Sequence, residues 1–437
     1  MAKKMLFLFV LLLSLTGMLK AQVTTAGMSG KVMADEESVI GATVVAVHEP
    51  SGTSYGTVTN VDGRFSLQGM RSGGPYKVTV SYIGYQTAIY TGIQLQLGET
   101  YSLNVTLHEA SELLGEITIT ASKSKFSAEK TGATTNISSE QLTTLPSINR
   151  SISDFTRISP YASGNSFGGR DGRSNTFTVD GANLNNNFGL SSGLPGGGNP
   201  ISLDAIDEVQ VVIAPYDVRQ ANFIGAGINA ITKSGTNAYR GSAYMYFNNE
   251  VMRGNKIGDT DFGARAEESK TVYGATFGGP IIKDKLFFFA NVEYEKSPQQ
   301  VITWRAAKEG ETPNNSTISR TTEADLAEFS QILKDKYGYN TGSFTDFPAD
   351  VTNLKLLGRI DWNINQGNKL SVRYNFTNNK TWEAPNGSSG NTGYRLAYNR
   401  VSAYSMSYAN SCYSLQNIVN SATAELNSRF SSNISNQ

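Results

Sequence analysis

Strict alternation of apolar and polar residues over long stretches is the feature that most constrains this chain. The clearest case ends at Glu295, where one face of the expected strand carries Phe288, Ala290, Val292 and Tyr294, and the other Asn291, Glu293 and Glu295. In a soluble sandwich, the apolar face would meet a second sheet and the polar face would meet water. In a membrane barrel, the apolar face meets lipid and the polar face a wet lumen.

The same alternation recurs downstream in segments 354–363 and 370–377, which are joined by the short turn Asn365–Asn368. Another tight turn lies at Lys283–Lys285, whereas the connections 296–352 and 380–401 are long and polar. Short turns at one end and long loops at the other are typical of outer-membrane barrels. A charged side chain facing mid-bilayer costs roughly 2–4 kcal/mol, which explains why charges keep to one face. We therefore predict barrel strands over residues 238–437.

The first residues indicate a secreted chain. Two lysines precede a short apolar run, Met5–Leu13, and small or polar residues follow. The run is short for a spanning helix and fits a signal peptide over residues 1–21. Cleavage is expected after Ala21, with Gly17 as the alternative.

Residue counts exclude several function classes. Cys412 is the only cysteine and His48 and His108 the only histidines, so disulfides, cysteine zinc sites and most histidine-based triads are excluded. Lys plus Arg and Asp plus Glu both total 37, which argues against a nucleic-acid partner. We expect no enzyme activity and no metal or other cofactor.

Short alternating runs separated by turns predict a small β-sandwich over residues 22–108. Asp62-Gly63 has the composition of a hairpin turn and is expected to join Thr57–Val61 to Arg64–Leu67. The runs "VIGATVVAV", "GTVTNVDGRFSLQGM" and "YKVTVSYIGYQT" resemble the carboxypeptidase regulatory-like domain. That resemblance implies a prealbumin-like sandwich that lacks the zinc ligands of the peptidase.

A linker over residues 109–130 contains one short β-branched segment, "EITITA". Such a segment can add to the exposed sheet edge of a partner through main-chain hydrogen bonds, or it can be the last strand of the sandwich. The residues concerned are Glu116, Ile117, Thr118, Ile119, Thr120 and Ala121.

Residues 131–237 are expected to form a mixed α/β domain. A Ser-x-x-Gln pattern at Ser138 or Ser139 predicts a helix start, Pro146 a break, and a second short helix follows. The runs "VDG", "IDEV" and "GAGINAITK" resemble the plug domain of TonB-dependent outer-membrane receptors. Where many receptors read R-G-P-x-x-x-x-Y-G, this chain reads "APYDVRQANFIGAG", which resembles the Oar-like branch.

The resemblance implies a set of plug residues. They are Arg170, Asp171, Arg173, Val179, Asp180, Gly181, Asp207, Glu208, Arg219, Gly225, Gly227 and Asn229. Among them, the charged residues Arg170, Asp171, Arg173 and Arg219 either pair with the inner barrel wall or remain solvated. Candidate substrate contacts are Asn183, Asn185, Asn186 and Asn187.

The expected fold is mostly β: a prealbumin-like sandwich, a mixed α/β plug, and the first strands of an incomplete transmembrane antiparallel barrel. A plugged barrel has about 22 strands, and this chain has room for about a third of them, so we expect the N-terminal part of a longer receptor. The resemblance implies a bacterial outer-membrane transporter with a periplasmic N-terminal domain. Its expected partners are the TonB energy-transducing protein, outer-membrane lipid and an unknown peptide, glycan or chelate. The alternative is an adhesin or structural surface protein without energised uptake.

Overall fold

We describe a computed structural model of the 437-residue chain. It describes residues 23–436 except 35–36, 110–116, 121–132, 148–149, 186–193, 195–198, 216–219, 222, 262, 264–267, 300, 303, 315–316, 386–400 and 431–434. The expected signal peptide therefore lies outside the described residues. Within them, none of the helices is both long enough and apolar enough to cross a bilayer.

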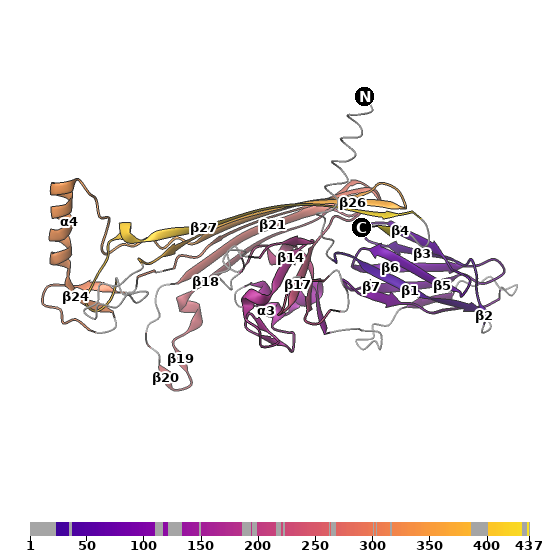
Figure 1. Cartoon of the computed structure of the whole chain (residues 1–437), viewed down its shortest axis with the longest axis horizontal. Coiled ribbons are helices and arrows are strands. Elements are labelled where there is room, and N and C mark those ends of the chain that lie inside the picture. The colour runs from indigo at the N-terminus through magenta and orange to yellow at the C-terminus, as the bar shows by residue number, and fades with distance from the viewer. Residues whose placement is uncertain are drawn as a thin grey trace, which may run out of the picture.

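Two five-stranded sheets form the N-terminal sandwich (Figure 1). The first contains β1 (Ala26–Ala34), β2 (Glu37–Ser38), β5 (Arg64–Met70), β8 (Thr100–Ser102) and β9 (Val105–Leu107). The second has the order β10 (Ile117–Thr120), β7 (Ala88–Leu95), β6 (Gly73–Ser81), β3 (Thr43–His48), β4 (Thr53–Val58). The predicted sandwich is confirmed.

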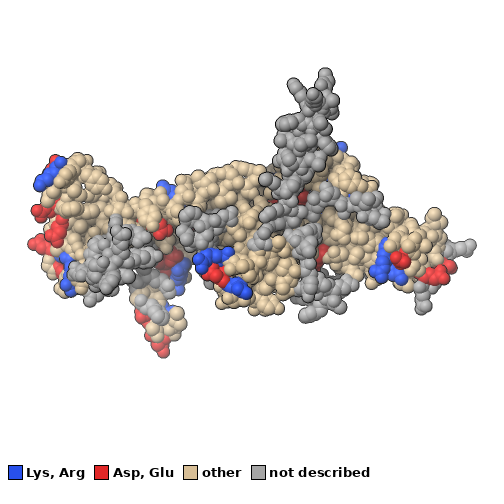
Figure 2. All heavy atoms as spheres, in the orientation of Figure 1, with Lys and Arg blue, Asp and Glu red and all other residues tan. Residues whose placement is uncertain are grey.

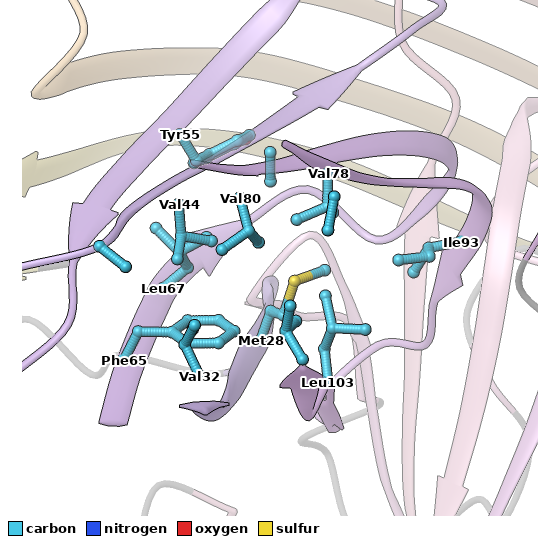
Figure 3. Packing of buried hydrophobic residues seen from close by; sticks show 14 of the residues in the cluster. Met28, Val32, Val44, Tyr55, Phe65, Leu67, Val78, Val80, Ile93 and Leu103 are labelled. Carbon is cyan, nitrogen blue, oxygen red and sulfur yellow. The ribbon is translucent and has the colours of Figure 1, made fainter. Parts of the chain in front are cut away.

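Apolar side chains from both sheets meet between them (Figure 3). Met28 and Val32 of β1 pack against Val44 of β3 and Val78 of β6, and all four are fully buried. Alternate residues of β3 are buried and accessible, as expected for a strand that covers a core with one face.

The expected hairpin at Asp62-Gly63 is wrong. The turn exists, since Gly63 has a φ of 71° and its N–H donates to the carbonyl of Asn60 at 2.9 Å. However, β4 pairs with β3 in one sheet and β5 pairs with β1 in the other. The turn therefore carries the chain from one sheet of the sandwich to the other, because the strand before it and the strand after it pair in different sheets.

The second domain is a five-stranded sheet with two short helices. Its order is β11 (Thr134–Ser138), β16 (Ile206–Val212), β17 (Gly227–Thr232), β14 (Thr176–Val179), β15 (Ala182–Asn183). Helix α2 (Ser139–Thr144) begins at Ser138, whose side chain and that of Gln141 form a reciprocal capping box, as predicted. Helix α3 (Ile152–Thr156) is the expected second helix.

The third part is a long, curved antiparallel sheet, here called the wall, that passes over the other two domains (Figure 1). Its seven strands are, in order, β18 (Arg240–Asn249), β21 (Ser269–Ile282), β22 (Leu286–Lys296), β25 (Thr352–Asn363), β26 (Asn368–Glu383), β27 (Tyr413–Arg429) and β28 (Ser435–Asn436). The predicted tight turns join β21 to β22 and β25 to β26.

The wall is inverted relative to a soluble sheet. On β22, Asn291 and Glu293 are only 5% and 4% exposed, whereas Val292 and Tyr294 are 43% and 40% exposed. On β25, the buried face likewise carries Lys355, Arg359 and Asp361. The polar face is therefore covered by protein and the apolar face is open. In Figure 2, the visible upper surface between the two ends of the molecule shows few charged side chains, whereas charges appear at both ends and in a patch lower in the middle.

The long loops at the far end of the wall contain ordered structure that was not expected. Strands β23 (Arg305–Ala307) and β24 (Ile318–Thr322) precede helix α4 (Glu323–Tyr337), which lies at the end opposite the sandwich (Figure 1). Tyr408 of the next loop donates to the carbonyl of Leu326 in α4 at 2.7 Å. The two loops therefore pack together as one unit.

Candidate functional site at the contact between plug and wall

The turn between β14 and β15 places a buried carboxylate at the edge of the second domain. Asp180 has a φ of 48°, a left-handed conformation that aspartate tolerates better than most residues, and Gly181 follows with 82°. The Asp180 carboxylate accepts the N–H of Thr232 at 3.0 Å and its hydroxyl at 2.6 Å. These bonds fix the carboxylate to the end of β17.

Two arginines of the wall approach this carboxylate. Nη1 of Arg359 lies 3.8 Å and Nε of Arg373 lies 3.7 Å from Oδ1 of Asp180. Arg359 also donates to the carbonyl of Thr232 at 2.6 Å. The arginines are directly opposite each other on β25 and β26, an arrangement of like charges that is unfavourable unless anions separate them.

Acidic residues of the wall supply the balancing charge. Arg359 donates to both oxygens of Asp361, with Nε at 2.8 Å from one and Nη2 at 3.0 Å from the other. Nη1 of Arg373 lies 2.8 Å from Oε2 of Glu425. Because ion pairs withdrawn from water must be matched to be tolerated, this cluster fixes the second domain in one position against the wall.

A second polar contact joins the same two parts of the molecule. Glu293 of β22 accepts from Lys355 of β25 at 2.8 Å, from Ser202 at 2.8 Å and from Tyr244 at 2.9 Å. Ser202 directly precedes the 3₁₀ turn η2 (Leu203–Ala205). Each contact is a hydrogen bond or an ion pair, a class of interaction that water can replace.

A cavity of about 480 Å³ remains between the helices of the second domain and strands β18 and β21. Leu142, Phe155, Lys233, Tyr246 and Val272 are among its lining residues. At its side, the Arg150 guanidinium lies 3.8 Å from the ring centre of Tyr246. The wall is therefore not in uniform contact with the domain that it covers.

One contact between the sandwich and the second domain is made by the turn at Leu97. The N–H of Leu97 is 3.1 Å from both carboxylate oxygens of Glu208, and the Gln210 amide donates to the carbonyl of Leu97. Burial raises the pKa of Glu208 to about 8, opposed by the Leu97 hydrogen bond and reinforced by the Asp207 and Glu99 carboxylates. The turn thus meets an acid that is readily protonated.

The other expected plug residues have mainly local roles. Asp171 and Arg173 bind each other at 2.8 Å with about half of each side chain exposed, and Arg170 is exposed, which is the solvated alternative. Asn229 accepts from the Thr178 hydroxyl at 2.6 Å. Val179 is buried in the core of the second domain.

Gly225, Gly227 and Asp207 are further expected plug residues that the structure describes. A Cβ at Gly225 would lie 2.3 Å from the Asn175 side chain, and one at Gly227 would lie 2.7 Å from the Phe223 ring. Burial raises the pKa of Asp207, opposed by Arg359, Lys233 and Arg71. Arg219 lies outside the described residues.

The expected substrate contacts divide in the same way. Asn185 accepts from the Phe177 N–H at 2.6 Å and donates to the carbonyl of Asn175 at 3.2 Å, so it holds the loop onto β14. Asn183 is exposed. Asn186 and Asn187 lie outside the described residues.

The β-branched segment of the linker is a strand. Residues Ile117–Thr120 form β10, which runs parallel to residues 88–91 of β7 at the edge of the sandwich. This is the second of the two interpretations that the sequence left open. Glu116 and Ala121 lie outside the described residues.

Sequence reasoning did not single out the wall residues of the site. They are Glu293, Lys355, Arg359, Asp361, Arg373 and Glu425. Their shared signal is a charged residue on the more polar face of an alternating strand. This pattern marks the face but does not say which residues will contact it. In the described part of the chain, no three of its His, Cys, Asp and Glu side chains are grouped so as to hold a metal ion.

The architecture agrees with comparisons to known proteins. A model of the carboxypeptidase regulatory-like domain matches residues 27–108, and a model of the outer membrane beta barrel domain matches residues 231–307. The TonB-dependent transporter Oar of Myxococcus xanthus is 25% identical over 344 residues, which cover 74% of this chain. The chain is thus similar to this outer-membrane transporter over most of its own length.

The aligned part of this chain spans 30% of the length of the Myxococcus protein. Among solved structures, the outer membrane transporter YddB from Escherichia coli is 13% identical with a TM-score of 0.41, over 68% of this chain and 37% of that one. The siderophore receptor PirA from Pseudomonas aeruginosa is 15% identical with a TM-score of 0.35, over 58% and 38%.

Proposed function

We propose that this chain acts in TonB-dependent transport across the outer membrane, with residues 131–237 as the plug and residues 238–437 as part of the barrel wall. The observation that carries the proposal is the inverted wall. Its buried face presents Lys355, Arg359 and Arg373 to the plug, and its apolar face is open to lipid. Phe289 and Leu357 of the wall also join the apolar core of the plug. The polar contacts are the part of this interface that water can replace when the plug is displaced.

Residues 116–121 are the proposed contact for the energy-transducing TonB protein. Support comes from the strand conformation of Ile117–Thr120 and from its place at a sheet edge, since strand addition is a common mode of peptide capture. The linker that follows leads directly to the plug, so force applied here would act on it. The substrate class is a peptide, glycan or chelate.

Cross-linking tests the proposal. A photo-reactive residue at Thr118 should form an adduct with the C-terminal domain of TonB in energised cells. The same group at the exposed Thr143 of α2 serves as the control and should give none. An absence of adducts at Thr118 would contradict the proposal.

A further inference from the structure

One arginine of the sandwich belongs to the charge cluster between plug and wall. Nη2 of Arg71 lies 3.3 Å from Oδ2 of Asp361, and the two side chains are 19% and 6% exposed. Arg71 follows β5 and lies at the surface of the sandwich that faces the wall. The cluster thus joins all three parts of the molecule.

Buried tyrosines of the sandwich fix the backbone of Arg71. Its N–H donates to the hydroxyl of Tyr55 at 3.1 Å, and its carbonyl accepts from the hydroxyl of Tyr76 at 2.7 Å. Both rings are buried in the sandwich core. The backbone of Arg71 is therefore held in one place, which limits the positions that its guanidinium can reach.

From Asp361 the contacts continue into the plug. The same carboxylate binds Arg359, and Arg359 binds the carbonyl of Thr232 at 2.6 Å and approaches Asp180. The series of contacts runs from the sandwich through the wall to the last residue of plug strand β17. Each step is a charge-assisted hydrogen bond or a close ion pair between buried groups.

The balance of charges makes this series of contacts depend on Arg71. Three guanidinium groups, those of Arg71, Arg359 and Arg373, meet the carboxylates of Asp180, Asp361 and Glu425. Asp207 also interacts with Arg71, Arg359 and Lys233, so removing Arg71 takes one cation away from a set of largely buried carboxylates. A buried charge without a partner is strongly destabilising. The unpaired carboxylate can regain hydration only if water enters between the plug and the wall.

We propose that Arg71 is a positioning residue through which the sandwich controls how firmly the plug is seated. With the sandwich docked, Arg71 completes the charge balance and Arg359 stays on Thr232 and Asp180. When the sandwich leaves the wall, the balance is lost and the end of β17 loosens. This inference deepens the proposed function. It rests on that function in one respect only, namely that loosening of the plug serves transport.

Docking of the sandwich on the wall also uses contacts that do not involve the Arg71 side chain. Asn363 of the wall donates to the Thr53 hydroxyl at 3.0 Å, and Nζ of Lys369 lies 3.3 Å from the ring centre of Tyr55. At Gly52 the approach is so close that a Cβ would lie 2.0 Å from the Asp284 carboxylate. These contacts hold the sandwich on the turns of the wall, and the neighbouring carbonyl of Pro50 accepts the N–H of Asn237, at the end of the plug, at 2.8 Å.

Hydrogen exchange of the full chain in detergent micelles tests the proposal. The readout is the exchange rate of peptides that cover Gly227–Thr232, because the Thr232 N–H is bonded to Asp180. Arg71→Ala should raise this rate about tenfold, and Arg71→Lys should restore most of the protection, since the lysine keeps the charge. The matched control Arg64→Ala, at an exposed position of β5, should leave the rate unchanged. Thr53→Val, which removes a docking contact, should raise the rate in the same direction as Arg71→Ala.

A double-mutant cycle separates the series of contacts from general destabilisation. In an Asp361→Asn background, Arg71→Ala should have no further effect on the exchange of Gly227–Thr232, because the carboxylate that links Arg71 to Arg359 is already absent. Exchange in β3 reports whether the sandwich remains folded, and it should match the parent chain.

Three results would overturn the proposal: no change in Arg71→Ala, an equal change in Arg64→Ala, or additive effects in the cycle. Neither a substrate nor the energy-transducing protein is present in this experiment. Its failure would therefore leave the transport proposal standing, and a failed cross-link would leave the Arg71 result standing.

Discussion

Nζ of Lys355 lies 2.8 Å from Oε1 of Glu293 on the neighbouring strand, and both side chains are almost completely buried between wall and plug. In a soluble sheet such a pair would face water. Here the water-filled side of a membrane wall is occupied by another domain, and the charges are matched within the wall before the plug adds Ser202. The pair therefore serves both the wall and its contact with the plug.

Lys355→Met should loosen the plug, because it leaves Glu293 as a buried charge without its cation. Breaking one partner of a buried pair costs about 3–5 kcal/mol. The measurement is the urea concentration at which peptides covering Ser202–Val212 lose protection from hydrogen exchange, which should fall. Lys285→Met, at an exposed turn, is the control. Equal midpoints for the two variants would refute a role for the pair.

Ile360→Lys tests which solvent the outer face meets. Ile360 is 47% exposed on the apolar face of β25, and a lysine near mid-bilayer costs roughly 2–4 kcal/mol. We expect less of this variant in the outer-membrane fraction than of the parent chain. Ile83→Lys, at a sandwich position that is 94% exposed, should be recovered normally. Unchanged recovery of Ile360→Lys would argue against lipid on this face.

The contact between Leu97 and Glu208 should weaken as pH rises. Burial raises the pKa of Glu208 from 4.5 to about 8, so the docked state favours the protonated acid. Its stabilisation is complete below about pH 4.5 and is lost as pH rises through about 8. After correction for intrinsic exchange, the opening free energy of the Leu97 amide should therefore fall between about pH 4.5 and about pH 8 and change little above that.

Two variants check the origin of that pH dependence. Glu208→Gln should remove most of it, because the amide does not ionise. Glu140→Gln, in the exposed first turn of α2, should keep the parent slope. A Glu208→Gln variant with the full parental pH dependence would assign the titration to another group.

Deleting residues 116–121 distinguishes energised transport from adhesion. A transporter should lose uptake of its substrate and still insert into the outer membrane, because the wall is untouched. An adhesin that works through its long loops should keep its binding activity. The comparison is between growth on defined nutrient sources and adhesion to a surface, with a deletion of six residues in 124–129 as the length-matched control.

Local patterns in the sequence predicted the strands of the wall, the two tight turns and the helix that begins after Ser138. These features follow from side-chain periodicity and from capping, which neighbouring residues decide. Helix α4 could have been predicted in the same way. Thr322 and Asp325 form a capping box, and Gly338 ends the helix in a left-handed conformation.

The partners of the charged residues could not be predicted, because they depend on how whole domains dock. Arg71 follows a sandwich strand and Asp361 ends a wall strand, 290 positions apart in the sequence, and nothing local in either segment specifies the other. The failed hairpin at Asp62-Gly63 has the same origin. The turn is local, but the choice of sheet for each strand is made by the packing of the sandwich.

The inverted face of the wall also determines what the pore would become without its plug. A surface built from Lys355, Arg359 and Arg373 with their acids would not collapse onto itself, because each group gains a hydration shell when the opposing domain leaves. Loss of the plug would then exchange protein contacts for water at these charged groups, and this part of the wall would stay hydrated.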